Sequence, residues 1–158
     1  MSMNADSIDF NIRPFVRADV ADLLQLMRGL AAFEGYLEDF AVSETDLVTH
    51  GLEADPPLFR AWVAERAGAL VGMAVTYDIL WTYERKLRVS LKELFVAKSA
   101  RGSGAGRALM DAVVEYARRQ GASGVHWTVM RGNTPAEAFY TNLGGAPDRK
   151  WENWSLKL

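Results

Sequence analysis

The sequence contains no cysteine, which excludes disulfide bonds, thiolate metal sites and a cysteine nucleophile. It has only two histidines, His50 and His126, and no spacing of side chains that is typical of metal ligands. The 158 residues carry a net charge of −2, so the chain lacks the basic excess of a typical nucleic-acid-binding domain. We therefore expect no metal and no nucleic-acid partner.

Long apolar runs are also absent. The longest uncharged apolar stretch, around "ALVGMAVTY", is far shorter than the roughly 20 residues that a membrane-spanning helix needs. The N-terminal "MSMNADSIDF" is polar and acidic and has no apolar segment typical of a secretory signal. These features predict a cytoplasmic protein without a membrane partner. At this length, and with 49% hydrophobic residues, residues 1–158 are expected to form a single domain.

The apolar periodicity predicts strands and helices that alternate in the manner of a mixed α/β domain built on one sheet. The expected strands cover residues 10–15, 58–66, 69–83, 87–96, 124–129 and 153–158. The expected helices cover residues 18–32, 43–52, 105–120 and 134–143. In strand 87–96, simple alternation places Leu91, Glu93 and Phe95 on one face and Ser90, Lys92 and Leu94 on the other.

The stretch "ARGSGAGRALM", residues 100–110, places three glycines where a helix is about to begin. Such a run is often only a flexible loop. Here it adjoins a helix start, where free backbone N–H groups and the helix dipole favour an anion, and glycine allows a ligand to approach the backbone closely. Three basic residues surround the run, namely Lys98, Arg101 and Arg107. The combination predicts a site for a phosphate or pyrophosphate.

The spacing of the glycines excludes the two commonest phosphate motifs. A P-loop needs four residues between its glycines and a following Lys-Ser/Thr, and the dinucleotide fingerprint needs a third glycine that this run lacks. No Gly-x-Ser-x-Gly occurs either, so a serine hydrolase is not supported. The pattern that fits is Arg-x-x-Gly-x-Gly at Arg101, Gly104 and Gly106.

This pattern resembles motif A of the GNAT superfamily of N-acetyltransferases, in which the turn holds the pyrophosphate of acetyl-CoA. A second stretch, "NTPAEAFYTNLG", resembles the superfamily signature Asn-x-x-Ala-x-x-Phe-Tyr-x-x-x-Gly in register. The resemblance implies a GNAT-like mixed, mostly antiparallel central sheet with flanking helices, and acetyl-CoA as co-substrate. It also implies a set of coenzyme-binding residues: Leu94, Phe95, Val96, Arg101, Gly102, Ser103, Gly104, Ala105, Gly106, Arg107, Asn133, Ala136 and Tyr140.

Almost the whole chain resembles the diamine (spermidine/spermine) branch of this superfamily, which includes thialysine acetyltransferases. The stretches "LMRGLAAFEGY", "LKELFV" and "WENW" carry this resemblance. It implies a homodimer, in which the C-terminal strand reaches toward the partner, and a set of acceptor-site residues: Phe33, Glu34, Lys92, Glu93, Glu152 and Trp154. One departure bears on the acceptor, because Lys92 replaces a branch glutamate that is implicated in receiving the substrate proton.

The implied reaction is acetyl transfer to a small amine by direct attack within a ternary complex. The resemblance implies that Tyr140 points its hydroxyl at the coenzyme sulfur, where it would donate a proton to the leaving thiolate. Glu93, acting through a water molecule, is the first candidate for the base, and Glu34 is the second. Two alternatives remain open at this point, namely a catalytically weak acyl-CoA-binding module and an enzyme that acetylates a protein amine.

Overall fold

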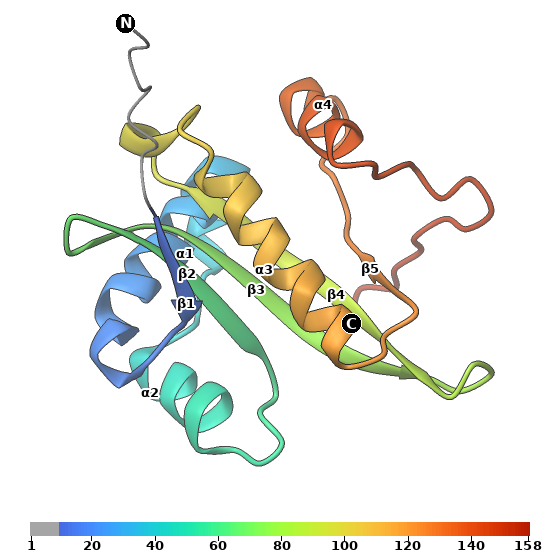
Figure 1. Cartoon of the computed structure of the whole chain (residues 1–158), viewed down its shortest axis with the longest axis horizontal. Helices are drawn as coiled ribbons and strands as arrows, with labels where there is room; N and C mark the ends of the chain where they lie inside the picture. Colours follow the sequence, from blue (N-terminus) through green and yellow to red (C-terminus); the bar gives the residue numbers. More distant parts are fainter. Residues whose placement is uncertain (1–9) are drawn as a thin grey trace, which may run out of the picture. The chain divides into compact units, whose positions relative to one another are not determined.

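A computed structural model describes residues 10–158 of the chain. Residues 1–9 lie outside the described part, and so does most of the stretch from which the absence of a secretory signal was predicted. The chain divides into two compact units, one ending at Trp127 and the other spanning Thr128–Leu158 (Figure 1). Each unit is described by itself.

The first unit is built on a five-stranded sheet in the order β1-β2-β3-β4-β5. Its strands are β1 (Asn11–Pro14), β2 (Arg60–Arg66), β3 (Ala69–Trp81), β4 (Lys86–Val96) and β5 (Gly124–His126). Neighbouring strands are antiparallel except β4 and β5, which are parallel. The prediction of a mixed, mostly antiparallel sheet is therefore confirmed, although β5 is shorter than the strand expected over 124–129.

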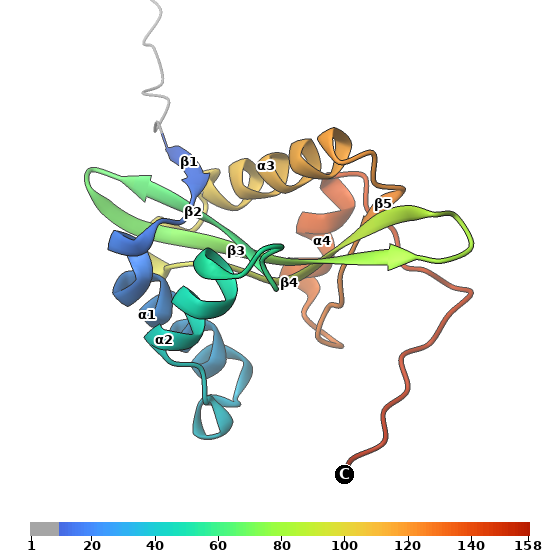
Figure 2. The same cartoon turned by 90° about the horizontal axis from the view of Figure 1, so that it is seen from below.

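Helices cover both faces of this sheet. Helix α1 (Val20–Glu34) and the short α2 (Glu44–Asp46) lie on one face, and α3 (Ala105–Arg119) lies on the other (Figure 2). Between α1 and the sheet lies a core of apolar side chains that are almost fully buried, including Leu23, Leu30, Val63, Met73 and Val75. The periodicity predicted α1 and α3 to within about two residues at either end.

The expected helix over 43–52 begins as predicted but continues differently. Ser43 and Asp46 form a capping box, in which each side chain accepts a hydrogen bond from the backbone N–H of the other residue. Beyond Asp46 the chain forms a π-helix, Leu47–Glu53. A Cβ atom at Gly51 would lie 2.7 Å from the rings of Phe15 and Phe59, so glycine lets this wide turn approach the aromatic core.

Strand β4 contains one residue more than its partner, and the extra residue is Lys92. Val75 of β3 pairs with Glu93, whereas the next residue of β3, Thr76, pairs with Leu91. Lys92 therefore has no partner on β3 and forms a β-bulge. Because side chains alternate between the two faces, the extra residue reverses which face the rest of the strand presents.

The part of β4 after the bulge places its odd-numbered side chains on the α1 face. A Cβ atom at Gly29 of α1 would lie 3.0 Å from the ring of Phe95. Met73 and Val75 pair with Phe95 and Glu93, and both belong to the buried cluster that includes α1. Glu93 and Phe95 consequently point toward α1.

The part of β4 before the bulge places its odd-numbered side chains on the α3 face. Asp78 pairs with Val89 and accepts a hydrogen bond of 2.5 Å from the hydroxyl of Tyr116 on α3. Thr76 pairs with Leu91 and lies two residues before Asp78 in β3, so it shares the same face. Val89 and Leu91 consequently point toward α3, where both are buried.

The prediction that Leu91 and Glu93 share a face is therefore wrong, and so is the prediction that Ser90 and Leu94 share the opposite face. Both rested on uninterrupted alternation, which holds only while the two strands advance residue for residue. The bulge at Lys92 breaks that match and brings the carboxylate of Glu93 to the α1 side.

The second unit contains α4 (Thr134–Asn142), which matches the prediction closely. Asn133 caps this helix by accepting a hydrogen bond of 3.3 Å from the backbone N–H of Ala136. The strand predicted over 153–158 is wrong, because residues 151–158 form no helix or strand and every one of them is exposed. The alternating pattern of this segment is typical of a strand, but a strand also needs a neighbour with which to pair.

Candidate functional site

Among residues 10–158, no strand pairs with one edge of β4 along its second half, and this is called the open edge. Strand β5 pairs with β4 only over Arg88–Ser90, and β3 occupies the other edge. The backbone N–H of Ala97 donates a hydrogen bond of 2.8 Å to the carbonyl of Val71. These two residues lie next to the Gly72–Val96 pair, where the β3–β4 pairing ends. By alternation, the backbone groups of Phe95 also face β3, whereas those of Leu94 and Val96 point to the open edge. Of the three strand residues expected to bind the coenzyme, Leu94 and Val96 thus direct their backbone N–H groups to the open edge.

The glycine turn follows directly from this strand and leads into α3. Gly102 and Gly104 have φ values of +74° and +93°, which residues other than glycine rarely adopt. The first helical hydrogen bond joins the N–H of Ala108 to the carbonyl of Gly104 at 3.0 Å. The N–H groups of Ala105, Gly106 and Arg107 precede it and lack a partner within the helix. The turn therefore has the backbone donors that suit an anion.

The side chains around the turn leave these donors accessible. The hydroxyl of Ser103 bonds backward to the carbonyl of Ala100, so it does not cap α3. Arg107 forms an exposed ion pair of 3.2 Å with Asp111 one helical turn further on. A cation close to a helix N-terminus strengthens the attraction for an anion.

Arg101 connects the open edge of β4 to the end of α1. Its Nε donates a hydrogen bond of 3.1 Å to the carbonyl of Val96 on the open edge. Its guanidinium carbon lies 5.4 Å from the ring centroid of Phe33 and 5.8 Å from that of Phe95. These are distances at which a cation is attracted to an aromatic face. Arg101 thus contacts one residue expected on the coenzyme side and one expected on the acceptor side.

Glu93, next to Leu94 on β4, has an unsatisfied carboxylate oxygen. Its Oε2 atom is buried and has no hydrogen-bond partner among the described residues. Burial raises the pKa of the Glu93 carboxyl above its ordinary value, Lys92 opposes this increase, and Glu34 adds to it. A carboxylate with a raised pKa accepts a proton more readily near neutral pH, which is what a general base requires.

The first unit holds three other residues expected at the acceptor site, of which two act on the charge of Glu93 and one lies near Arg101. Lys92, on the bulge, and Glu34, at the end of α1, both influence the Glu93 carboxyl. Phe33 is exposed over 58% of its surface and lies beneath Arg101. Sequence reasoning missed Tyr36 and Tyr77, whose pKa values are raised by burial and by the charge of Glu93. No local motif marks either tyrosine.

The second unit carries the remaining predicted residues. Asn133, Ala136 and Tyr140 lie on or next to α4, where the ring of Tyr140 packs edge-on against Phe139 at 5.1 Å. Glu152 and Trp154 lie in the exposed C-terminal segment, and Trp154 is exposed over 89% of its surface. The roles of these residues remain predictions.

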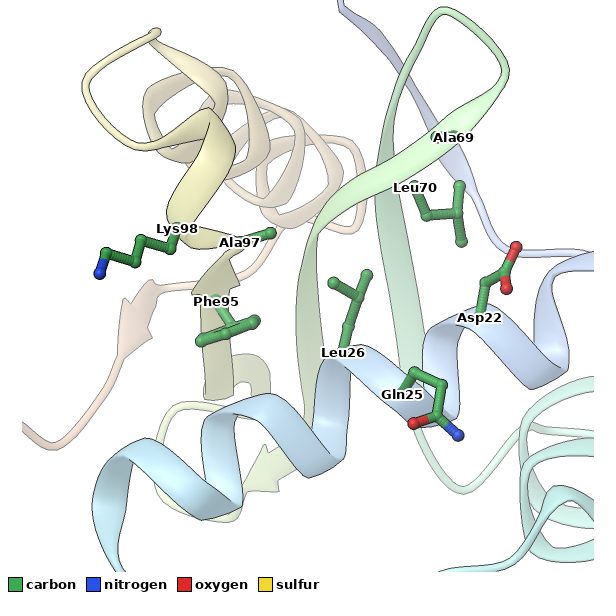
Figure 3. A pocket seen from close by; sticks show the side chains of 8 residues that line it. All are labelled: Asp22, Gln25, Leu26, Ala69, Leu70, Phe95, Ala97 and Lys98. Atoms are coloured by element: carbon green, nitrogen blue, oxygen red, sulfur yellow. The ribbon is translucent and has the colours of Figure 1, made fainter.

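A hollow of about 380 Å³ lies in the first unit between α1, the start of β3 and the end of β4. Figure 3 shows the side chains of Leu26, Leu70 and Phe95 along it, with Asp22 at one end and Lys98 directed outward at the other. Of the residues expected to bind the coenzyme or the acceptor only Phe95 lines it, together with Lys98, one of the basic residues next to the glycine run. No local pattern marks this hollow in the sequence, because its lining comes from segments far apart in the chain.

Residues 10–158 contain no group of three histidine, aspartate or glutamate side chains placed to hold a metal ion. No helix within this part of the chain has the length and apolar character that crossing a membrane requires.

Comparisons with known proteins agree with the fold and the motifs. The sequence pattern of the acetyltransferase (GNAT) family matches residues 21–144. Thialysine N-epsilon-acetyltransferase of Mus musculus is 28% identical over 151 residues, which cover 90% of this chain and 88% of that protein. Spermidine/spermine N(1)-acetyltransferase-like protein 1 of Homo sapiens is 28% identical over 162 residues, which cover 98% of this chain and 23% of that protein.

The fold has close counterparts among solved structures. An aminoglycoside acetyltransferase from an uncultured soil metagenomic sample, in complex with trehalose, superposes with a TM-score of 0.80. The superposition covers 97% of this chain and 98% of that one at 19% sequence identity. The predicted fold class is therefore confirmed.

The geometry of the turn leads to a first prediction. Gly106 lies in the first turn of α3 at an ordinary helical conformation, so Gly106→Val adds bulk beside the free N–H groups without straining the backbone. We expect Gly106→Val to reduce acetyl-CoA affinity strongly, as measured by calorimetry, with little change in melting temperature. Ala112→Val, further along the same helix, is the matched control. Equal affinities for the two variants would rule out the turn as the coenzyme site.

Proposed function

The chain is an acetyl-transferring enzyme of the acetyltransferase (GNAT) family, and we propose that it acetylates a primary amine of a small molecule. The acceptor is a diamine, a polyamine or an amino acid with a side-chain amine, such as thialysine or lysine. The observation that supports this proposal most directly is the buried, unpartnered carboxylate of Glu93 next to the open edge at Leu94. It places a proton acceptor beside free backbone donors.

Acetyl-CoA supplies an activated acetyl thioester. The free N–H groups at Ala105, Gly106 and Arg107, together with the nearby cations, fit the charge of its pyrophosphate. The open edge at Leu94 and Val96 fits the amides of its pantetheine arm, because an extended polar chain pairs readily with an unpaired strand edge. The other residues proposed to bind it are Phe95, Arg101, Gly102, Ser103, Gly104, Asn133, Ala136 and Tyr140.

The amine must lose a proton before it attacks, and the departing sulfur must gain one. Glu93 is the proposed base, acting through a water molecule, because burial makes its carboxylate a stronger proton acceptor. A backbone N–H on the open edge, at Leu94 or Val96, is suited to polarise the acetyl carbonyl. Tyr140 is the proposed acid that returns a proton to the sulfur.

Lys92 is proposed to select the acceptor. Its ammonium group lies close enough to Glu93 to influence that carboxyl, so a cationic acceptor near Glu93 also meets a like charge. A carboxylate on the acceptor would turn the repulsion into attraction. Glu34, Glu93 and Glu152 remain proposed partners for the acceptor's distal amine. An amino acid with a side-chain amine carries both groups.

A panel of amines tests the function and the role of Lys92 together. Thiol release from acetyl-CoA is measured with lysine, thialysine and spermidine. We expect a higher kcat/KM for the two amino acids than for spermidine, and we expect Lys92→Glu to shift the preference toward spermidine. Lys86→Glu, at the start of the same strand, is the matched charge control.

Two outcomes would count against these proposals. Stabilisation by acetyl-CoA without amine-dependent thiol release would indicate a binding module instead of an enzyme acting on small amines. An active enzyme whose preference is unchanged in Lys92→Glu would remove Lys92 from the acceptor site.

The Tyr140 proposal has its own test. Tyr140→Phe keeps the aromatic ring and removes the hydroxyl, so we expect kcat to fall by about 10²-fold, a usual size for general acid catalysis. Coenzyme affinity should change little, as measured by calorimetry. If kcat is retained, Tyr140 is a packing residue and water supplies the proton.

We further propose a cytoplasmic homodimer that depends on the residues after Lys150. Trp151 and Trp154 are exposed over 71% and 89% of their surfaces, and large exposed apolar side chains are typical of interaction sites. Light scattering should show the mass of a dimer for the full chain and the mass of a monomer after truncation at Lys150. A stable monomer of the full chain would contradict the proposal.

A further inference from the structure

Within the described part of the chain, three polar side chains on the α1 side of the first unit have no protein partner for their hydrogen-bonding atoms. Tyr36 and Tyr77 make no hydrogen bond through their hydroxyls within residues 10–158, and neither does the carboxylate of Glu93. By contrast, Tyr83 and Tyr116 each donate their hydroxyl to a neighbouring carboxylate. Of these groups, the Oε2 atom of Glu93 is fully buried, and a buried carboxylate oxygen without a partner is costly unless something else satisfies it. Two hydroxyls without protein partners on the same side add further places for a ligand to bond.

The bulge in β4 brings Tyr77 and Glu93 to the same face. Glu93 pairs with Val75, which is two residues before Tyr77 in β3, so both β3 side chains point toward α1. The ring of Tyr77 lies 6.4 Å from that of Phe59, a member of the buried cluster on this side. Tyr77 is therefore held by its ring while 37% of its surface remains exposed.

Tyr36 approaches from the end of α1. Gly35 ends the helix in the left-handed conformation, with φ +83°, and the N–H of Tyr36 bonds the carbonyl of Ala31 at 2.9 Å. This closure, typical of helix C-termini, fixes the backbone from which the side chain of Tyr36 projects. Its position is thus set by helix geometry and not by its hydroxyl.

The electrostatics agree with a common location. The charge of Glu93 raises the pKa values of both Tyr36 and Tyr77, after burial as the larger cause, so both hydroxyls stay protonated near neutral pH. The other ionisable groups that act on this cluster are Glu34, from the end of α1, and Lys92, from the bulge.

We propose that the hydroxyls of Tyr36 and Tyr77, together with the carboxylate of Glu93, form the seat that receives and orients the acceptor's amino group. The inference rests on the proposed function and adds two acceptor-binding residues to it. A protonated primary amine has three N–H bonds, which match one carboxylate and two hydroxyl oxygens. One N–H bond then breaks, its proton passes to a Glu93 oxygen directly or through water, and the nitrogen keeps the electron pair needed for attack.

Tyr36→Phe and Tyr77→Phe test the seat, because each keeps the ring and removes only the hydroxyl. We expect each variant to lower kcat/KM for the best acceptor of the amine panel by about tenfold, since a hydrogen bond to a charged group contributes at least that much. The KM for acetyl-CoA and the melting temperature should stay unchanged. Tyr83→Phe, on an exposed tyrosine that bonds Glu84, is the matched control and should match the wild type.

The pH profile provides a second measurement that a purely structural role would not change. The acidic limb of kcat/KM should lie above pH 4.5, the ordinary value for the carboxyl, because the pKa of Glu93 is raised. Loss of either hydroxyl makes the surroundings less polar and disfavours the charged carboxylate. The limb should therefore move to higher pH in Tyr36→Phe and Tyr77→Phe, and stay in place in Tyr83→Phe.

The outcomes separate this inference from the proposed function. If the wild-type protein acetylates no small amine, the proposed function fails whatever the tyrosine variants do. If the wild type is active and both variants keep its acceptor kcat/KM and pH profile, the seat is overturned while the function stands. If one variant loses stability, the other carries the test alone.

Discussion

The pairing between β3 and β4 is the interaction on which the rest of the candidate site depends. It holds β4 along one edge for its whole length, while β5 covers the other edge only at Arg88–Ser90. The unpaired half of β4 then offers backbone donors at Leu94 and Val96. The single extra residue at Lys92 directs the Glu93 side chain toward α1 within the same short stretch. Backbone donors and a buried carboxylate thus come from neighbouring residues of one rigid strand.

Charges of opposite sign gather at two different places along this strand. The turn that follows β4 gathers cations and free N–H groups, whereas the α1 side gathers Glu34 and Glu93. Arg101 bridges the two regions through its hydrogen bond to Val96 and its position over Phe33. The first unit thus has separate regions of opposite charge, which suit the anionic coenzyme and the amine of the proposed reaction.

The sequence predicted those features that short-range chemistry determines. Apolar periodicity located α1 and α3, and the helix expected from residue 43 begins there in the structure. The glycine turn was recognisable because positive φ angles and helix starts leave local signatures. The family also followed from two short motifs in the correct order.

Other features depend on how distant segments of the chain pack together, and they could not be predicted from the sequence. The bulge at Lys92 leaves no trace in the hydropathy pattern, because Leu91 and Glu93 are compatible with either register. Tyr36 and Tyr77 are 41 positions apart and are linked only through the face that Glu93 shares with them. The C-terminal segment has a strand-like pattern, but strand formation depends on an available edge, which local pattern does not specify.

The bulge also bears on how this strand tolerates a change of length. Removal of Lys92 would leave Leu91 opposite Thr76 and Glu93 opposite Val75, so plain alternation would keep both side chains on their present faces. Such a deletion would remove only the unpaired residue and the local bend that a bulge introduces. The face that Glu93 presents therefore depends on its pairing with Val75 and not on the side chain at position 92.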